Sequence, residues 1–362
     1  MTKHSNTNPH QTDNPSHGPE AESQHADTVR TDTGATADHV IDKLSEYFGA
    51  PVRRANRAER RAGQAARVAI FGNPVPDPTT SFDTIGKQDV IIRIIRERDL
   101  PYPVVLPELI DRSDIELVHH PRYVHAVLTG EPFDLAGSGL SWDPGRYEEV
   151  LISTSAVVAA VRFAIANHSN AGCTSSGLHH AKAERGEGFC TFNGLAIAAI
   201  KAVQGGAKRV LILDLDAHCG GGTAQLIAGR EGIEQVDVSV STYDRYVNTP
   251  NATLYMARGD NYLQVIGDAL AAIVDPESID VVLYNAGMDP HEDCTIGGVS
   301  GVDAQVLAER ERLVFEWANS RGIPVAFTLA GGYKSSDLTA EELADLHLET
   351  FAAAHASAPI AR

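Results

Sequence analysis

Residues 209–215 form an almost continuous apolar run, Arg-Val-Leu-Ile-Leu-Asp-Leu, which is rich in branched side chains. Such a run indicates a strand that is buried on both faces, as in a parallel sheet. Asp214, Asp216 and His218 follow one another at a period of two, so an extended chain would point all three to the same side. Since open α/β sheets bind ligands at the carboxyl ends of their strands, this segment predicts a polar site at the end of a central strand.

Strand patterns and helix patterns alternate along most of the chain. Apolar strand patterns occur at residues 68–71, 209–214, 235–241, 281–284 and 323–329. Helical periodicity occurs at residues 87–98, 121–129, 148–167, 191–204, 262–274, 303–319 and 340–354. The alternation predicts an α/β protein with three layers (α/β/α), in which helices cover both faces of one parallel sheet. Because the motifs are spread over residues 65–362, we expect a single domain there.

A further acidic side chain follows a second apolar run. Val281–Tyr284 predicts another strand, and Asp289-Pro290 comes shortly after it. Asp289 would then join Asp216 and His218 at neighbouring strand ends. Two carboxylates and one imidazole, with a fourth position left for water, are the ligands of a catalytic metal site. The set suits zinc, although the ligand types leave iron(II) and manganese open. Each segment alone would be explained by a turn or a polar strand end, so the prediction depends on their joint occurrence.

Two adjacent histidines, His179 and His180, lie in a Gly-rich stretch about thirty-five residues before this strand end. Tandem histidines alone are more often surface or loop residues. Beside a metal site, however, they would supply two proton-transfer groups. A metal that acidifies water and a histidine that accepts the proton are the parts needed to hydrolyse an amide.

Together these segments resemble the histone deacetylase family of the arginase/deacetylase superfamily. The resemblance extends from about Arg67 to near the C-terminus and leans toward bacterial-type deacetylases and acetylpolyamine amidohydrolases. The matching segments come in the family's order, and they are residues 177–181 (Gly-Leu-His-His-Ala), 188–193 (Gly-Phe-Cys-Thr-Phe-Asn), 214–218 (Asp-Leu-Asp-Ala-His), 286–291 (Ala-Gly-Met-Asp-Pro-His) with Gly297-Gly298, and 331–333 (Gly-Gly-Tyr).

The resemblance implies a role for each matched residue. It implies that the metal ligands are Asp216, His218 and Asp289. It implies that His180 is the general base and acid, that His179 is its electrostatic partner, and that Asp214 holds His179. It implies that the hydroxyl of Tyr333 polarises the scissile carbonyl. From the sequence alone, a half-buried core tyrosine is an equally good interpretation of Tyr333.

The resemblance also implies substrate and cation sites. Gly188 and Phe189 would line a narrow tunnel for the acyl-lysine chain, although a core position is the commoner fate of a phenylalanine. Asp143 falls where the family keeps a rim aspartate that grips the substrate backbone. A structural monovalent cation such as K⁺ is expected beside Asp214, Asp216, His218, Ser239 and Val240.

The sequence departs from the family at Gly221. The family usually continues the metal motif as His-Gly-Asp-Gly or His-Gly-Asn-Gly, whereas this chain reads Cys219-Gly220-Gly221-Gly222. Gly221 therefore stands where the partner of the second histidine should be. We hypothesise that His180 is held by water, by a backbone carbonyl or by a residue from elsewhere. Because a carboxylate partner raises a histidine's pKa, we expect a lower pKa for His180. The loop at residues 74–83 diverges too, which leaves the acyl-chain preference open.

Composition sets the remaining expectations. Residues 1–36 are polar and nearly free of large apolar side chains, which predicts a disordered tail. Residues 37–64 predict a short amphipathic helix and a basic linker. The four cysteines show no paired spacing and predict no disulfide framework. We find no signal sequence and no apolar run long enough to span a membrane, so we expect a cytoplasmic protein. An oligomer is compatible with the sequence.

Charge bears on the partners. The net charge is −18, of which the first 36 residues carry −3 (five acids against two bases), leaving −15 on the remainder. Such a surface repels nucleic acid and attracts cationic substrates. We therefore expect a zinc-dependent deacetylase or amidohydrolase that acts on linear amides, either an acylated lysine peptide or protein or an acetylated polyamine.

Two rival interpretations remain at this point. An arginase-like ureohydrolase would bind two metals and would need further aspartates, in Asp-Ala-His-x-Asp and Asp-x-Asp-x-x-Asp strings, which the sequence lacks. Metal stoichiometry would separate it from a one-metal deacetylase. A catalytically weak or inactive acyl-lysine-binding protein or partner subunit would fit the loss of a side chain at position 221. Turnover assays would separate it from an enzyme.

Overall fold

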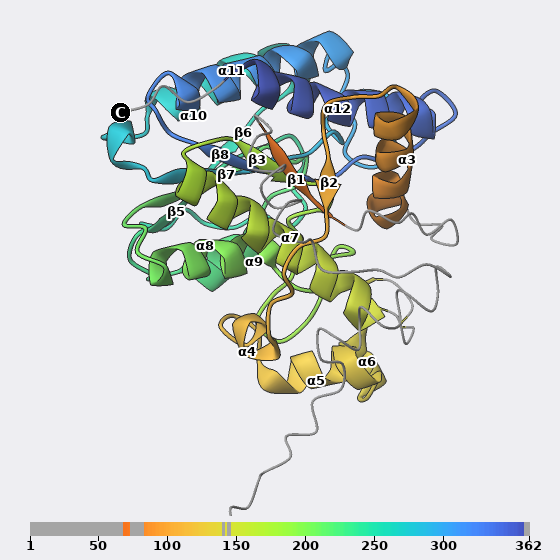
Figure 1. Ribbon diagram of the computed structural model, residues 1–362, viewed down its shortest axis with the longest axis vertical. Coiled ribbons are helices and arrows are strands. Elements are labelled where there is room, and N and C mark those ends of the chain that lie inside the picture. The colour runs from red at the N-terminus through yellow and green to blue at the C-terminus, as the bar shows by residue number, and fades with distance from the viewer. Residues whose placement is uncertain (1–67, 73–82, 140–141, 143–145, 358–362) are drawn as a thin grey trace, which may run out of the picture. The chain divides into compact units, whose positions relative to one another are not determined.

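The computed structural model describes residues 68–72, 83–139, 142 and 146–357 (Figure 1). The expected tail at residues 1–36, the expected helix and linker at residues 37–64, and Asp143 lie outside the described residues. All described residues belong to one compact unit, as the single-domain interpretation requires.

One eight-stranded sheet forms the centre of this unit. Its strands are β1 (Ala69–Phe71), β2 (Val104–Val105), β3 (Ala171–Cys173), β4 (Val210–Asp214), β5 (Ile233–Ser239), β6 (Ala252–Met256), β7 (Val281–Ala286) and β8 (Val325–Leu329). Their order is β2-β1-β3-β8-β7-β4-β5-β6, and every neighbouring pair is parallel. The carboxyl ends of all eight strands therefore lie along the same edge.

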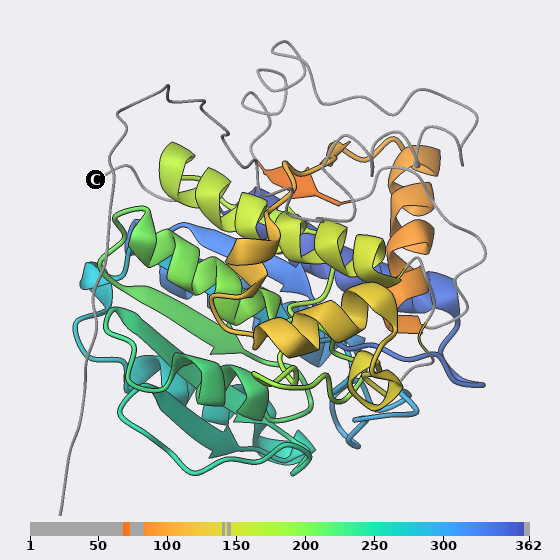
Figure 2. The ribbon, with the colours of Figure 1, turned by 90° about the horizontal axis from the view of Figure 1, so that it is seen from below.

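Helices cover both faces of the sheet (Figures 1 and 2). One face carries α3 (Asp83–Glu97), α10 (Tyr262–Ala271), α11 (Ala304–Asn319) and α12 (Ala340–Ala356). The other carries α4 (Arg112–Ile115), α5 (Pro121–Thr129), α7 (Arg146–Asn167), α8 (Gly194–Gln204) and α9 (Gly221–Ile227). Helix α6 (Phe133–Ala136) follows α5, and short 3-10 helices occupy Gly259–Asn261 and Pro276–Ser278. The predicted three-layer α/β/α fold is confirmed.

Strand β4 shows why the core has two layers. Leu211 and Leu213 pack into the core beside α10 and α11, whereas Val210 and Ile212 pack into the core beside α7 and α8. Successive side chains of a strand point to opposite faces, so an apolar residue is needed at every position. Full burial of each of these side chains contributes about 1.5–3 kcal/mol.

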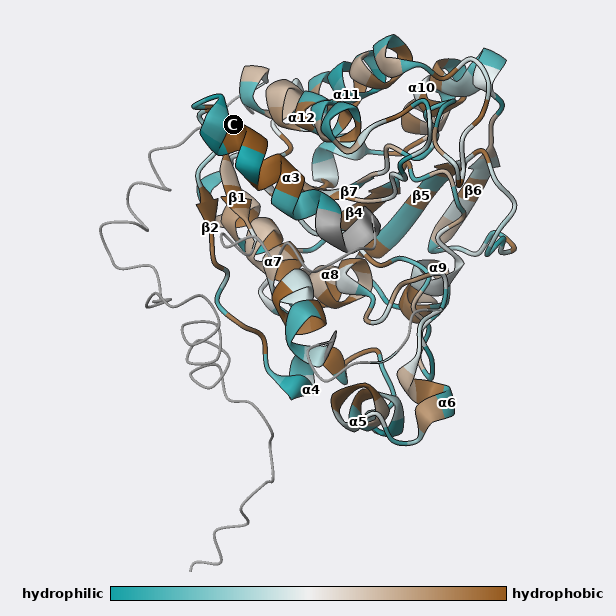
Figure 3. Ribbon diagram, turned by 90° about the vertical axis from the view of Figure 1, so that its right-hand side faces the viewer, coloured by the Kyte–Doolittle hydropathy of each residue, from teal (hydrophilic) through white to brown (hydrophobic). Residues whose placement is uncertain are grey.

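Helix α3 is apolar on one side only. In α3, Ile91, Ile94 and Ile95 are buried, whereas Arg93 is exposed. Figure 3 shows the brown and teal residues of this helix side by side. The spacing of three and four residues between the isoleucines is that of one helix face, so the pattern that predicted the helix also orients it.

Helix α7 corrects one expectation. Its residues Tyr147–Asn167 are long and apolar enough to cross a membrane, which the sequence analysis overlooked, but 61% of the apolar window is buried inside the protein. The helix packs against β3 and α8, and its apolar residues belong to the core around α8. Its composition is therefore explained by its place as a core helix.

A buried ion pair ties α11 to the carboxyl edge of the sheet. Arg310 donates hydrogen bonds to the carbonyls of Gly287 (2.6 Å) and Leu215 (3.3 Å), to the hydroxyl of Tyr262 (3.1 Å) and to the carboxylate of Glu311. Leu215 and Gly287 directly follow β4 and β7, so the guanidinium fastens two segments that lead to the predicted site. Both side chains of the pair are almost fully buried.

We predict that Arg310→Met destabilises the fold. Removing one member of a buried pair leaves the other charge uncompensated, which costs about 3–5 kcal/mol. Arg312→Met on the same helix is the matched control: its side chain is 52% exposed, and such surface pairs contribute about 0–1 kcal/mol. Urea denaturation measures both free energies of unfolding, and equal losses for the two variants would contradict the prediction.

Candidate active site

The predicted site residues meet at the carboxyl ends of four strands. Strands β3, β8, β7 and β4 are neighbours in the sheet, so the segments that follow them share one region. These segments carry His179 and His180 after β3, Asp216 and His218 after β4, Asp289 after β7, and Tyr333 after β8. The sheet order therefore brings together residues that are far apart in the sequence.

Asp216, His218 and Asp289 form one compact group. His218 Nδ1 lies 3.1 Å from Asp216 Oδ1 and 3.0 Å from Asp289 Oδ2. One ligand atom from each residue lies within 4.8 Å of the others. The expected extended geometry is wrong, however. Strand β4 ends at Asp214 and the chain bends over residues 216–218, so Asp214 points to a different partner.

The surroundings of this group fit a cation. Asp289 Oδ2 is buried, and its contact with His218 Nδ1 at 3.0 Å lacks hydrogen-bond geometry, so this oxygen accepts no hydrogen bond from the described residues. A Cβ at Gly331 would lie 2.2 Å from this atom and 2.6 Å from Asp216 Oδ2. Because glycine has no Cβ, its backbone can lie directly against both carboxylates. A buried carboxylate oxygen without a partner is costly, and a divalent cation would offset that cost.

The charges at the group support the same conclusion. Burial and the neighbouring Asp216 raise the pKa of Asp289 to about 6. Burial lowers the pKa of His218, but Asp216 and Asp289 more than reverse this and raise it to about 10. The field that attracts a proton to this imidazole also attracts a divalent cation. Metal binding here would accordingly release protons.

His179 is held by Asp214, as the resemblance implies. Its Nδ1 donates to Asp214 Oδ2 (2.8 Å), and Asn285 Nδ2 donates to the other oxygen of that carboxylate (2.8 Å). Burial lowers the pKa of His179, but Asp214 and Asp216 outweigh it and raise it to about 10. These carboxylates therefore favour the protonated form of His179 more than that of His180.

His180 has a partner that the sequence analysis did not name. Its Nδ1 lies 3.1 Å from Asp244 Oδ2, so the hypothesised residue from elsewhere is Asp244, in the loop after β5. An ionised carboxylate only accepts hydrogen bonds, so Nδ1 carries the proton and Nε2 keeps its lone pair. Burial and the charge of His179 lower the pKa of His180 to about 4, although Asp244 raises it. The pKa is lowered as expected, but the expected reason, the lack of a carboxylate partner, is wrong.

Gly188 and Phe189, for which the resemblance implies a place in the substrate tunnel, form a turn in which Phe189 has a strained backbone. Gly188 and Phe189 have φ angles of +55° and +65°, and residues other than glycine seldom adopt this backbone conformation. The Phe189 N–H donates to the carbonyl of Ser138 (2.7 Å), which holds this turn. Both residues are half-buried. Backbone strain of this kind collects at functional sites, so the segment suits the substrate role that the resemblance implies.

Tyr243 is a further aromatic residue at the site that the sequence analysis missed. Its ring lies edge-on to His180 at 4.9 Å and to His218 at 6.0 Å between ring centroids. The residue is 44% exposed, so it covers the histidines from the solvent side. No motif marks it, because its place depends on the path of the loop after β5.

Tyr333 is buried at the same site. The Gly331 N–H donates to Asp216 Oδ2 (2.8 Å), and the Met288 N–H donates to the Gly331 carbonyl (2.7 Å). These bonds fix the Gly-Gly-Tyr segment beside the metal-binding group. Burial raises the pKa of Tyr333, so its hydroxyl remains a proton donor at neutral pH.

The predicted monovalent cation position lies close by. The Val240 N–H donates to the Ala217 carbonyl (3.0 Å), which joins the segment after β4 to the end of β5. Asp214, Asp216, His218 and Ser239 are buried around this junction. The K⁺ site itself stays a prediction.

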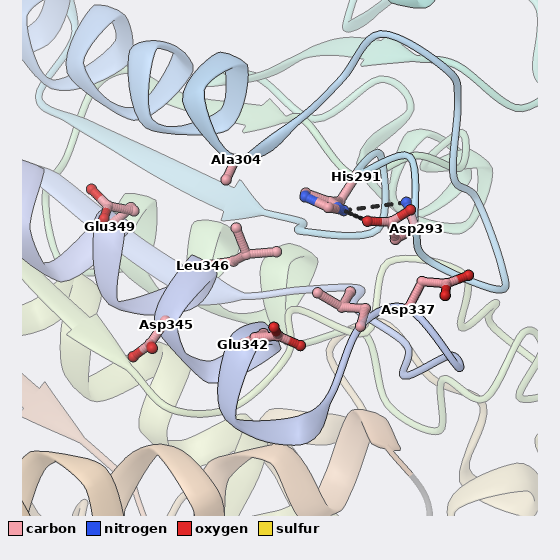
Figure 4. Close-up of a pocket in the computed structure, with 9 residues that line it drawn as sticks. His291, Asp293, Ala304, Asp337, Glu342, Asp345, Leu346 and Glu349 are labelled. Atoms are coloured by element: carbon pink, nitrogen blue, oxygen red, sulfur yellow. Dashed lines mark hydrogen bonds and ion pairs between the residues drawn. The ribbon is translucent and has the colours of Figure 1, made fainter.

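A separate acidic cavity of about 320 Å³ lies between the start of α11, the first turns of α12 and the loop after β7 (Figure 4). Five carboxylates line it, with His291 at one side (Asp293, Asp337, Glu342, Asp345 and Glu349). None of the three candidate metal ligands contributes to it. The cavity adds negative potential to this part of the surface.

We predict that the chain binds one divalent cation at the Asp216–His218–Asp289 group. Asp216→Asn or Asp289→Asn should weaken zinc affinity by more than about 100-fold, because loss of even an outer partner of a ligand costs about 10–100-fold. Asp293→Asn is the matched control, since this nearby carboxylate is 43% exposed. Competition with a zinc chelator measures the affinity, and equal affinities for all variants would contradict the prediction.

Comparison with known proteins agrees with this geometry. The histone deacetylase domain family matches residues 84–350. An uncharacterized protein of Picosynechococcus sp. is 35% identical over 64% of this chain and 79% of its own length. A probable deacetylase of Methanothermobacter thermautotrophicus is 26% identical over 72% and 82%.

Two solved structures share the fold at low sequence identity. The HDA15 HD domain superimposes with a TM-score of 0.64 at 15% identity, covering 81% of this chain and 90% of that one. An acetylpolyamine aminohydrolase from Burkholderia pseudomallei gives 0.64 at 17%, covering 80% and 99%. The family match extends over the whole site, from α3 to α12, and the shared fold supports it. This chain belongs to the histone deacetylase family.

Proposed function

We propose that this protein is a metal-dependent amidohydrolase that removes an acyl group from a primary amine, either a lysine side chain or a polyamine. The observation that carries the proposal is the buried Asp216–His218–Asp289 group with a histidine pair beside it. The rings of His179 and His180 lie 4.0 Å apart, and the ring of His180 lies 5.9 Å from that of His218. Base and candidate ligands therefore border one space.

Zinc is the cation that we propose for this group, and iron(II) is the alternative that the ligand types leave open. A bound divalent cation would lower the pKa of water and polarise the scissile carbonyl. One imidazole and two carboxylates leave a coordination position open, as in catalytic rather than structural zinc sites.

His180 is the proposed general base and acid. With its proton on Nδ1, it presents the Nε2 lone pair to the attacking water. Burial, and then the charge of His179, keep the pKa of His180 low, so the base is neutral at physiological pH. After accepting a proton it becomes a strong acid, which suits return of that proton to the leaving amine.

Tyr333 is the proposed oxyanion donor. A neutral hydroxyl can stabilise the negative oxygen of the tetrahedral intermediate without giving up its own proton. Gly332 has a φ angle of +156°, and a Cβ there would lie 2.8 Å from Leu343. A glycine at this position lets the backbone run close to α12 and bring the tyrosine to the site.

The substrate class follows from charge and shape. Residues 37–362 carry a net −15, which favours approach of cationic molecules. Phe189 and Tyr243 offer apolar surfaces to a linear carbon chain. An acetylpolyamine aminohydrolase shares the fold, and we extend its substrate class to this chain as a proposal together with acyl-lysine. The non-catalytic alternative loses its main support, because Asp244 supplies the partner that position 221 lacks.

We predict turnover of a fluorogenic acetyl-lysine peptide or an acetylated polyamine by the zinc-loaded protein. His180→Ala should lower kcat by about 10²–10⁴-fold, and Tyr333→Phe by about 10²–10³-fold. The matched control is Tyr102→Phe, which should leave kcat unchanged. Tyr102 is a buried tyrosine in the part of the core beside α3 and α12. Absence of turnover in the wild type, combined with tight binding of a hydroxamate inhibitor, would instead favour an acyl-lysine-binding protein.

We also predict an unusually acidic lower limit of activity. The base works in its neutral form, so the rate falls as the pH drops through the pKa of His180, which is lowered to about 4. The acid limb of kcat/KM should therefore lie well below pH 6.5, about where an unperturbed histidine titrates. Zinc content is measured at each pH as the control. An acid limb at or above pH 6.5 with zinc retained would contradict the assignment.

A further inference from the structure

We propose that Asp244 is the positioning residue of His180, and that Lys182 and Glu187 hold it in place. The inference rests on the proposed function, because a base must be oriented to act. Position 221 is a glycine in this chain, so it has no side chain that could orient His180. The loop between β5 and β6 takes over this role through Asp244.

The contacts of the Asp244 carboxylate are those of an orienting group. Its Oδ2 accepts from His180 Nδ1 at 3.1 Å and from the Gly222 N–H at 3.0 Å. Its side chain is only 6% exposed. Burial raises its pKa, but the hydrogen bonds from His180 and Lys182 outweigh burial and hold it below the usual value. The residue is thus an ionised, buried acceptor aimed at the ring nitrogen that must carry the proton.

Gly221 and Asp244 depend on each other sterically. A Cβ at position 221 would lie 2.2 Å from the Asp244 carbonyl oxygen and 2.6 Å from its Oδ1. Real Cβ atoms essentially never approach so closely to backbone. The space that a side chain at position 221 would occupy is therefore filled by Asp244, and the glycine is what admits it.

The backbone at Asp244 is also in an uncommon conformation. Its φ angle is +56°, which a residue other than glycine adopts at a cost of about 1–3 kcal/mol when the surrounding structure enforces it. A glycine or asparagine would fit the turn more easily. The turn alone does not require an aspartate, and the side chain of this one reaches His180.

Lys182 ties this loop to the turn at Gly188 and Phe189. Its Nζ lies 2.9 Å from Asp244 Oδ1 and 2.9 Å from Glu187 Oε2. Glu187 directly precedes Gly188 and Phe189. The ammonium therefore joins the carboxylate that orients the base to the segment that we expect to line the substrate path.

The first test compares single variants of the zinc-loaded full chain. Asp244→Ala should lower kcat by about 100-fold, the lower end of what a positioned base contributes, with KM, zinc content and Tm little changed. Asp244→Asn should recover part of this loss, because its amide oxygen still accepts from Nδ1. Asp114→Ala is the matched control: Asp114 also bridges a lysine, Lys201, and a backbone N–H, but it lies on α4.

The second test moves the carboxylate back to position 221. Gly221→Asp alone should lose activity, because the new side chain collides with Asp244. In Gly221→Asp combined with Asp244→Gly, the clash with the Asp244 carboxylate is removed, and a glycine at position 244 lets the backbone move its carbonyl away from position 221. The new carboxylate then approaches His180 from the other side, so the kcat of the double variant should exceed that of either single variant. A double variant no better than Asp244→Gly would count against the exchange of roles.

The third readout does not depend on turnover. In proton NMR of the zinc-loaded protein, the Nδ1–H of His180 should give a downfield signal that Asp244→Ala and His180→Ala both remove and Asp114→Ala keeps. If no substrate is turned over but Asp244→Ala and His180→Ala still remove this signal, Asp244 positions His180 and the proposed function fails. An unchanged signal and kcat in Asp244→Ala, or a parallel loss of Tm and zinc, would overturn the inference.

Discussion

The site depends on carboxylates that the fold buries side by side. Asp214, Asp216 and Asp289 are almost fully buried, and charges in such surroundings must be paired or bound to a cation. Asp214 is paired with His179. Asp216 and Asp289 share His218, and one oxygen of Asp289 has no hydrogen-bond partner among the described residues. A divalent cation would complete this arrangement, and the proposed chemistry would follow from its position.

The sheet order turns this local chemistry into an active site. Parallel strands end on one edge, and the order β3-β8-β7-β4 places four loops there. Buried hydrogen bonds from Arg310 fasten the segments after β4 and β7. The His179 and His180 side chains then receive different partners, and their pKa values move apart. Such a division suits a neutral His180 as the proton-transfer group and a charged His179 as its electrostatic partner.

The sequence predicted the central strands and the three candidate ligands, because a doubly buried strand needs continuous apolar residues and the ligands follow such strands. It missed β2 (Val104–Val105), β3 (Ala171–Cys173) and β6 (Ala252–Met256). Strand β2 has only two residues, β3 is three residues long and has no branched side chain, and β6 is only partly buried. Asp244 and Tyr243 were missed because neither lies in a motif. Their positions depend on the loop after β5, which fills the space beside Gly221. The sequence marked Gly221 as a departure, but no pattern showed which residue fills that space.

The most direct test of this account is anomalous diffraction at the zinc edge from crystals of the zinc-loaded protein. The account predicts one strong peak bonded to His218 Nδ1 and to a carboxylate oxygen of each of Asp216 and Asp289, at about 2.0–2.2 Å. A map without density between these three side chains, or with zinc only at other positions such as the histidines of residues 1–36, would contradict it.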